Sequence, residues 1–182
     1  MFRCLLALSS LLAALPTPGR VAQPLPPNLL LDDAFDDNRQ GWRMGTTDNA
    51  TFSLERGHYR LLNRQDVSQS YQALPLNTTA DYALEATVQL TGSGRGGLFW
   101  GAADDDNGNV FALEDDGRRY VIGRWQKGKW EELRPAAALP GAAAGPAHAL
   151  RVVVHAGTIS YSIDGTEVWT QAAGRVFGTG VG

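Results

Sequence analysis

Cysteine is almost absent from the chain, and its scarcity excludes several kinds of protein. The 182 residues contain one cysteine, Cys4, close to the N-terminus. A disulfide framework, thiol catalysis and a cysteine-ligated zinc site are therefore not expected. The three histidines, His58, His148 and His155, are scattered and have no cysteine partner, so zinc is not expected from them either.

An excess of basic charge is also missing. Sixteen lysines and arginines stand against 19 acidic residues, which gives a formal net charge of −3. The chain therefore lacks the excess of positive charge that is typical of proteins that bind nucleic acid. A Gly-x-Ser-x-Gly turn, which a serine hydrolase of the α/β class would need, is absent as well.

The chain has a single long apolar run, at its start. A positive start at residues 1–3 precedes an apolar run over residues 4–15 and a small-residue, turn-rich segment over residues 16–22. This order is typical of a secretory signal peptide, whereas a membrane anchor needs roughly 20 apolar residues. We expect a soluble protein without membrane insertion, secreted or held in the periplasm or at the cell surface. The predicted parts are a signal peptide over 1–22, a proline-rich spacer over 23–28 and one domain over 29–182.

Helix signals are nearly absent after the signal peptide. The alanine-rich stretch 136–149 has high helix propensity, but proline and glycine interrupt it repeatedly, at Pro135, Pro140, Gly141, Gly145 and Pro146. We interpret this stretch as a long loop that leads into a strand over 150–155.

Short runs with alternating apolar and polar residues recur along the rest of the chain. The run over 81–90 is the clearest, and Asp164-Gly165 is a strong signal for a two-residue hairpin. Many short strands at such spacing predict an all-β fold, either a two-sheet antiparallel β-sandwich or a jelly roll. The predicted strands are 50–55, 58–63, 68–74, 81–90, 97–102, 110–114, 119–125, 130–134, 150–155, 158–163 and 166–170.

Several motifs, in this order, carry a resemblance. They are Asp32 to Asn38 followed by Gly41-Trp42, then Glu55 to Tyr59, Gly97 to Gly101, Gly128 to Trp130 and Ser162 to Gly165. Over about residues 30–182 the chain resembles exported bacterial concanavalin A-like lectin/glucanase domains, which are LamG-like. More distantly it is similar to the domain of 3-keto-disaccharide hydrolases. The resemblance implies a concanavalin A-like jelly roll, an opening strand near residues 30–35, and Trp42 and Trp169 packed against the sheet edges.

Glucanases of this superfamily carry alternating acids on one strand, followed by a second glutamate. Here the nearest match is Glu114 and Asp116, but arginines occupy positions 118 and 119 where the third acid would stand. Gly117 also indicates that the chain turns there. The incomplete pattern favours the end of a hairpin over a catalytic site, and we assign no catalytic residue.

The acidic segment 104–109 raises the question of calcium. Counted back from Gly108, an EF-hand frame would begin at Ala103, so the frame fails. We expect a solvated hairpin tip and no cofactor, with a calcium site shared with Asp32 or Asp36 as the alternative.

Tryptophan offers the remaining functional lead. Trp100, Trp125 and Trp130 lie on predicted strands that we expect to be neighbours, and an indole face suits the flat C–H face of a sugar ring. The polar fringe of such a ligand site would come from Arg124, Glu114 and Glu132. The alternative is that these tryptophans pack inside the sandwich, as tryptophan usually does.

Three functional classes follow from these observations. The first is an exported, non-catalytic module that binds a polysaccharide or oligosaccharide. The second is a glycoside hydrolase of the 3-keto-disaccharide or a related type, and the third is a structural or interaction domain at the cell surface. The sequence favours the first, because the resemblance suggests glycans while the acid pair for hydrolysis is incomplete.

The end of the chain carries one more expectation. In the family that the chain resembles, two further strands follow a run like Arg175 to Gly182, and the last of them pairs with the opening strand. We expect the chain to be truncated before these strands, which would leave the opening strand without a neighbour.

Overall fold

The computed structural model describes residues 30–64, 72–73, 81–92, 94–141, 146–174 and 176–182, and every regular element in them is a β-strand. All strand pairs in these residues are antiparallel. The sequence prediction of an all-β antiparallel fold is therefore confirmed. The strands are β1 (Gly45–Thr46), β2 (Ala50–Leu54), β3 (Tyr59–Asn63), β4 (Gln72–Ala73), β5 (Tyr82–Gln89), β6 (Gly96–Asp104), β7 (Asn107–Glu114), β8 (Arg119–Gln126), β9 (Lys129–Ala138), β10 (Ala147–His155), β11 (Thr158–Ile163), β12 (Thr166–Ala172) and β13 (Gly180–Val181).

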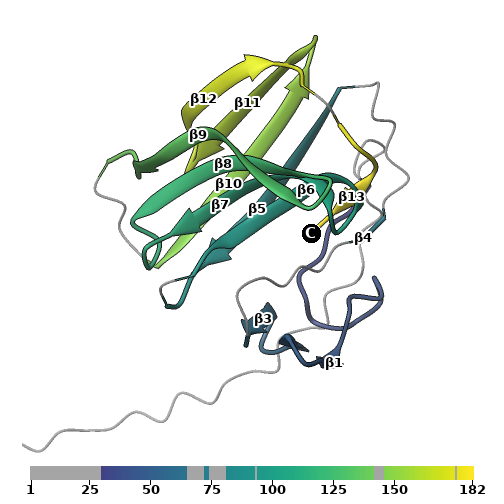
Figure 1. The fold of residues 1–182 in the computed structure, drawn as a ribbon. Coiled ribbons are helices and arrows are strands. Elements are labelled where there is room, and N and C mark those ends of the chain that lie inside the picture. The colour runs from purple at the N-terminus through teal and green to yellow at the C-terminus, as the bar shows by residue number, and fades with distance from the viewer. Residues whose placement is uncertain (1–29, 65–71, 74–80, 93, 142–145, 175) are drawn as a thin grey trace, which may run out of the picture.

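Two sheets pack face to face as a sandwich (Figure 1). One has six strands in the order β4-β13-β6-β7-β8-β9, and the other has four in the order β12-β11-β10-β5. The core lies between them, and each fully buried aliphatic or aromatic side chain in it stabilises the fold by about 1.5–3 kcal/mol. The six-stranded sheet contributes Leu98, Trp100, Phe111, Leu113, Tyr120 and Ile122, and the four-stranded sheet contributes Leu150, Val152, Val154, Ile159, Tyr161 and Ile163.

Strict alternation builds the four-stranded sheet. Along β5, the residues from Tyr82 to Val88 at every second position pack against the core, while those between them are exposed. The β11–β12 hairpin turns at Asp164 and Gly165, with φ of 49° and 78°. These left-handed angles match a two-residue turn, so the hairpin that Asp164-Gly165 predicts is confirmed.

A third sheet of three strands, β1-β2-β3, lies apart from the sandwich in Figure 1. It has its own aromatic cluster, in which the ring of Trp42 is 5.7 Å from that of Phe35 and 5.2 Å from that of Tyr59. Trp42 is 7% exposed. The expectation that Trp42 is a packing residue holds, but it packs in this cluster and not against an edge of the sandwich.

Two predictions about chain segments are wrong. The stretch 136–149 is not a continuous loop, because β9 runs to Ala138 and β10 begins at Ala147. Pro135 is tolerated because β9 is an edge strand, where a missing N–H need not interrupt the ladder. The opening strand near residues 30–35 is not formed: Phe35 has φ of 57°, and its N–H donates to Asp33 Oδ1 at 2.8 Å in a turn.

Some expectations lie outside the described residues. The predicted signal peptide and spacer do so entirely, and of the predicted strand over 68–74 only β4 is described. In the part of the chain that is described, no helix has the length and apolar character needed to cross a membrane.

Candidate functional site

The β8–β9 hairpin carries most of the predicted ligand-binding residues. Its turn is formed by Lys127 and Gly128, with φ of 54° and 68°. Across the hairpin, Trp125 pairs with Trp130 and Arg124 with Glu131. Because side chains alternate along a strand, the two tryptophans face one side of the sheet, and Arg124 shares the other side with the core residue Ile122.

We call the side that faces away from the four-stranded sheet the outer face. Trp125, Trp130 and Glu132 lie on it, since Glu132 pairs with Gly123 in the same row as these tryptophans. The two indole rings are 5.6 Å apart with an interplanar angle of 60°, and both are partly exposed. They therefore form an open corner rather than a single flat plane.

Gly123 allows the Trp130 indole to lie across β8. A Cβ atom at Gly123 would collide with the Cη2 and Cζ2 atoms of Trp130. The Arg95 guanidinium carbon is 5.2 Å from the ring centroid of Trp130. Glycine at position 123 is thus required by the close approach of the indole.

Glu114 is engaged by arginines. Arg95 Nε donates to its Oε2 at 3.0 Å, and Arg119 Nε is 3.8 Å from its Oε1. The Glu114 side chain is 13% exposed, far less than that of Arg95 at 47%. Glu114 therefore serves as an anchor for Arg95 and does not offer a free carboxylate to a ligand.

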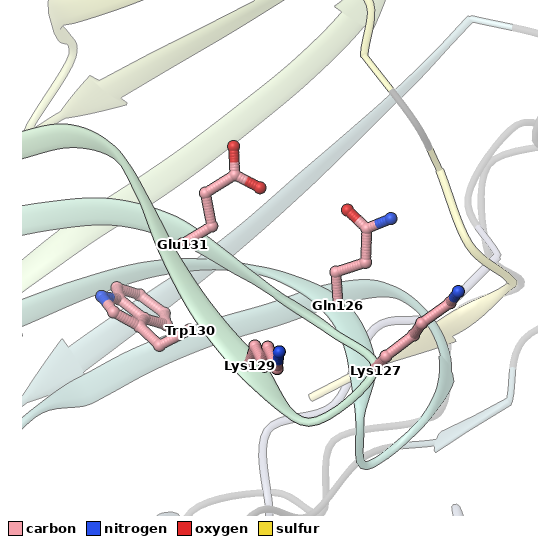
Figure 2. Close-up of a pocket in the computed structure, with 5 residues that line it drawn as sticks. All are labelled: Gln126, Lys127, Lys129, Trp130 and Glu131. Carbon is pink, nitrogen blue, oxygen red and sulfur yellow. The ribbon is translucent and has the colours of Figure 1, made fainter.

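A shallow hollow of about 280 Å³ lies at the tip of the β8–β9 hairpin (Figure 2). Its lining includes Lys127 and Lys129, the only lysines in the sequence. Glu131 points to the opposite side from Trp130 in Figure 2, and its Oε2 accepts hydrogen bonds from Arg124 Nε and forms an ion pair with Arg124 Nη2, both at 2.8 Å. The remaining lining residue is Gln126.

The structure separates Trp100 from the other predicted site residues. Its side chain is 1% exposed, and its ring lies 6.3 Å from that of Tyr161 in the core. Strand β7 lies between β6, which carries Trp100, and β8. Trp100 cannot stack on a ligand from the core, so its assignment to the binding site is corrected. Trp125, Trp130 and Glu132 share one face, while Arg124 lies on the other and Glu114 is held by Arg95.

The acids of the expected glucanase pattern do not form a pair on one strand. β7 ends at Glu114, and Asp115, Asp116 and Gly117 follow with φ of 52°, 54° and 79°. Three successive left-handed residues turn the chain into β8. The interpretation of this segment as the end of a hairpin is confirmed.

The acidic segment 104–109 forms a hairpin tip. Asp104 Oδ1 accepts hydrogen bonds from the Asp106 N–H at 2.9 Å and from Asn107 Nδ2 at 2.8 Å. The turn is shorter than the sequence predicts, because β7 already begins at Asn107. Among the described residues, no group of three or more histidine, cysteine or acidic side chains is arranged to hold a metal ion.

Arg95 is a residue of this region that the sequence did not reveal. It directly precedes β6 in a glycine-rich stretch, 35 residues from Trp130 in the chain. Strands β7 and β8 separate their two strands in the sheet. No local pattern marks such a contact, and only the register of the whole sheet brings the two side chains together.

Comparisons with known proteins give a single likeness to report. No family model matches the chain, and no curated protein matches its sequence. Among solved structures, the chain is similar to the carbohydrate binding module CBM66 from Bacillus subtilis, at 14% identity and a TM-score of 0.47. The match covers 77% of this chain and 81% of that chain.

Proposed function

We propose that the chain is an exported, non-catalytic β-sandwich module that binds carbohydrate on the outer face of the β8–β9 hairpin. The observation that carries the proposal is the corner formed by Trp125 and Trp130. Their rings are 5.6 Å apart at 60° and partly exposed. Partly exposed paired indoles on an outward sheet face are suited to a ligand with a flat apolar surface and a polar edge.

A sugar ring has both surfaces. Its C–H face would stack on the Trp125 indole, over which no described cation lies, while the Trp130 ring would close one side of the corner. Glu132 shares this face, and its exposed carboxylate has no ion-pair partner among the described side chains. It is therefore available to accept hydrogen bonds from sugar hydroxyls, and the amide of Gln126 at the hairpin tip could both donate and accept.

A glycan array with the purified protein tests the proposal. We expect binding to at least one class of neutral or acidic glycan, lost in Trp125→Ala and weakened in Glu132→Gln. Glu167→Gln is the matched control, because Glu167 is an exposed glutamate on β12 of the other sheet. An array without any signal for the unmodified protein would refute the proposal.

The hydrolase alternative is tested by reducing-sugar release from the glycans that bind. We expect none, because Glu114 is hydrogen-bonded to Arg95 and the neighbouring Asp116 is in a left-handed turn. Release that is abolished by Glu114→Gln would favour a hydrolase instead. The LamG-like resemblance belongs to the same proposal. The signal peptide proposed for residues 1–22 supports a secreted, periplasmic or surface location.

A second candidate function is an interaction domain. The exposed large apolar side chains of the described chain all belong to residues 30–64, the part of the chain that contains the small sheet, and they are Leu30, Met44, Leu61 and Leu62. Scattered apolar residues are ordinary on a surface, but their concentration in one region favours a protein contact there. Loss of a protein partner in Leu61→Lys, together with a negative glycan array, would favour this second function.

A further inference from the structure

Arg95 contacts Trp130 across two intervening strands. It directly precedes β6, whereas Trp130 is on the edge strand β9, with β7 and β8 between them. The guanidinium nevertheless lies over the Trp130 ring, with Cζ 5.2 Å from the ring centroid. A cation at this distance from an indole face is attracted by the ring quadrupole.

Glu114 limits the freedom of Arg95. The Arg95 Nε donates to Glu114 Oε2 at 3.0 Å, and the Glu114 side chain is only 13% exposed. A charge-assisted hydrogen bond to a largely enclosed carboxylate holds an arginine that would otherwise sample many rotamers. The hydrogen bond thus restricts the orientations that the guanidinium can adopt beside Trp130.

Trp130 needs such a contact to keep one orientation. Among the described strands, β9 is paired with β8 alone. The indole lies close to Gly123, which has no side chain to hold it, and the ring of Trp125 lies at 60° to it. Arg95 supplies a further contact to the face of the indole ring.

We propose that Arg95, fixed by Glu114, is a positioning residue that holds the Trp130 indole at the angle required for the corner with Trp125. The inference rests on the proposed function, because it names the residue that shapes the same binding face. It assigns to Glu114 a role through Arg95 and Trp130 and not through direct contact with a ligand.

The test measures the order of the Trp130 indole and the affinity for a glycan in Arg95→Gln and Arg119→Gln. Arg119→Gln is the matched control: it removes the same charge near Glu114, but Arg119 donates to the Ala136 carbonyl and lies 3.8 Å from the carboxylate. The indole order parameter comes from ¹⁵N relaxation of the Trp130 Nε1–H resonance, assigned with Trp130→Phe.

We expect Arg95→Gln to lower the order parameter of the Trp130 indole and to weaken glycan binding about two- to fivefold, as for an exposed cation–π contact. Arg119→Gln should change neither, and Arg95→Lys should recover part of both because it keeps the cation. Equal melting temperatures for the two glutamine variants would exclude a general loss of structure.

An unchanged order parameter in Arg95→Gln would overturn the inference, as would unchanged affinity for a glycan that Trp125→Ala no longer binds. These outcomes leave the proposed function intact. If no glycan binds the unmodified protein, the proposed function fails, and the order parameter alone then decides whether Arg95 positions Trp130.

Discussion

Tryptophans in this chain have different environments: Trp125 and Trp130 are partly exposed, whereas Trp100 is buried in the core. Trp125 and Trp130 flank a predicted turn, so their pairing across a hairpin follows from the turn itself. Trp100 lies in the continuous apolar run Gly97 to Ala102, and the structure buries residues 98–102 of this run on both faces of β6. Alternation cannot assign an inward face in such a run, which is why Trp100 could not be placed from the pattern.

This difference predicts opposite effects of alanine substitution. Trp100→Ala should destabilise the fold by about 3–5 kcal/mol, as for other large aromatic residues in a core. Trp125→Ala and Trp130→Ala should leave unfolding nearly unchanged and weaken glycan binding by about 1–3 kcal/mol. Denaturant unfolding measures the stability of the variants, and calorimetry measures their binding. If the Trp125 and Trp130 variants lost as much unfolding free energy as Trp100→Ala, both indoles would belong to the core.

Gly123 gives a prediction about the shape of the binding face. Gly123→Ala should displace the Trp130 indole, because the added Cβ collides with its ring, and should cost about 1–3 kcal/mol of stability as overpacking. Binding should fall as well. Gly174→Ala is the control, since no atom lies within 4 Å of its Cβ position. Equal glycan affinity of both variants would show that binding does not depend on the position of the Trp130 indole over Gly123.

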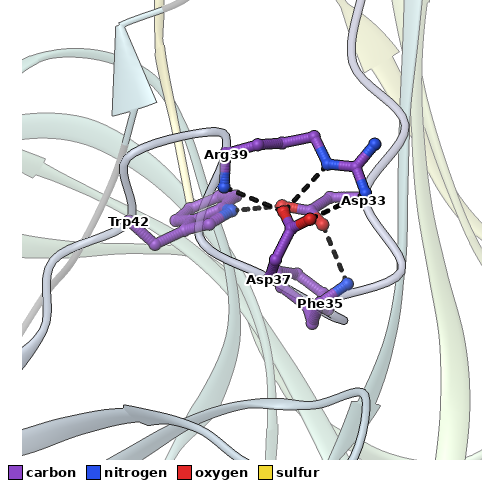
Figure 3. A network of polar contacts seen from close by, with 5 residues as sticks. All are labelled: Asp33, Phe35, Asp37, Arg39 and Trp42. Atoms are coloured by element: carbon purple, nitrogen blue, oxygen red, sulfur yellow. Dashed lines mark hydrogen bonds and ion pairs between the residues drawn. The ribbon is translucent and has the colours of Figure 1, made fainter.

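Asp33 makes two hydrogen bonds to members of the aromatic cluster around Trp42 (Figure 3). Its Oδ2 accepts from the Trp42 indole Nε1 at 2.6 Å, and its Oδ1 accepts from the Phe35 N–H at 2.8 Å. Asp33→Ala leaves the buried indole donor without its acceptor, so we expect a loss of about 1–3 kcal/mol in unfolding free energy. Asp37→Ala breaks the ion pair with the Arg39 guanidinium and a hydrogen bond from the Arg39 N–H, but both are exposed to solvent, so this variant should lose much less stability than Asp33→Ala. Similar losses of unfolding free energy in both variants would mean that the hydrogen bonds of Asp33 stabilise the protein no more than the exposed contacts of Asp37 do.

Strand β10 is held at both of its ends by the same arrangement. At its start, Asp164 accepts from the Ala149 N–H at 2.8 Å and lies 2.8 Å from His148 Nδ1. At its end, Asp81 accepts from the Ala156 N–H at 2.9 Å and lies 2.7 Å from His155 Nδ1. Each carboxylate thus binds a histidine and the backbone of the following residue, which ties β10 to the β11–β12 turn and to the start of β5.

The first of these arrangements predicts a pH dependence of stability. The hydrogen bond from His148, and then that from the Ala149 N–H, lowers the pKa of Asp164. A carboxyl group with a lower pKa in the folded state adds stability above its unfolded pKa, and this stability is lost as the pH falls through the folded pKa.

Asp164→Asn removes the charge but suits the left-handed φ of 49° and keeps an acceptor for the Ala149 N–H. The wild type should therefore melt above this variant at pH 7, and the gap should shrink below about pH 4. Melting curves across this range measure the gap. A gap that is constant with pH would show that ionised Asp164 adds no stability.

At the level of elements, the sequence predicts strands and turns that depend on neighbouring residues, but it does not predict which strands lie at the edge of a sheet. The strand over 158–163 and its hairpin appear with the predicted bounds, because alternation and the Asp-Gly turn act within a few residues. The opening strand fails because a strand needs a neighbour, while Asp33 offers the Phe35 N–H a local partner instead. The predicted loop after Pro135 fails for a related reason. Whether a strand tolerates proline depends on which side of the strand is paired, and the sequence does not show this.

At the level of the whole molecule, the sandwich could be predicted, but the three-sheet arrangement and the full site could not. The spacing of the strands along the chain predicts the sandwich. The aromatic cluster around Trp42 forms by packing between residues 35, 42, 52 and 59, which no periodic pattern connects. In the site, the tryptophan pair follows from one turn. The place of Arg95 over Trp130 depends on the register of four strands, β6 to β9, and thus on the assembled sheet.

Glycan-array binding of the unmodified protein beside Trp125→Ala tests the central claim most directly. The outward corner of Trp125 and Trp130 predicts binding to a defined glycan class by the unmodified protein and its loss in the folded variant. Binding that persists unchanged in Trp125→Ala would contradict the site, and no binding by the unmodified protein would contradict the function.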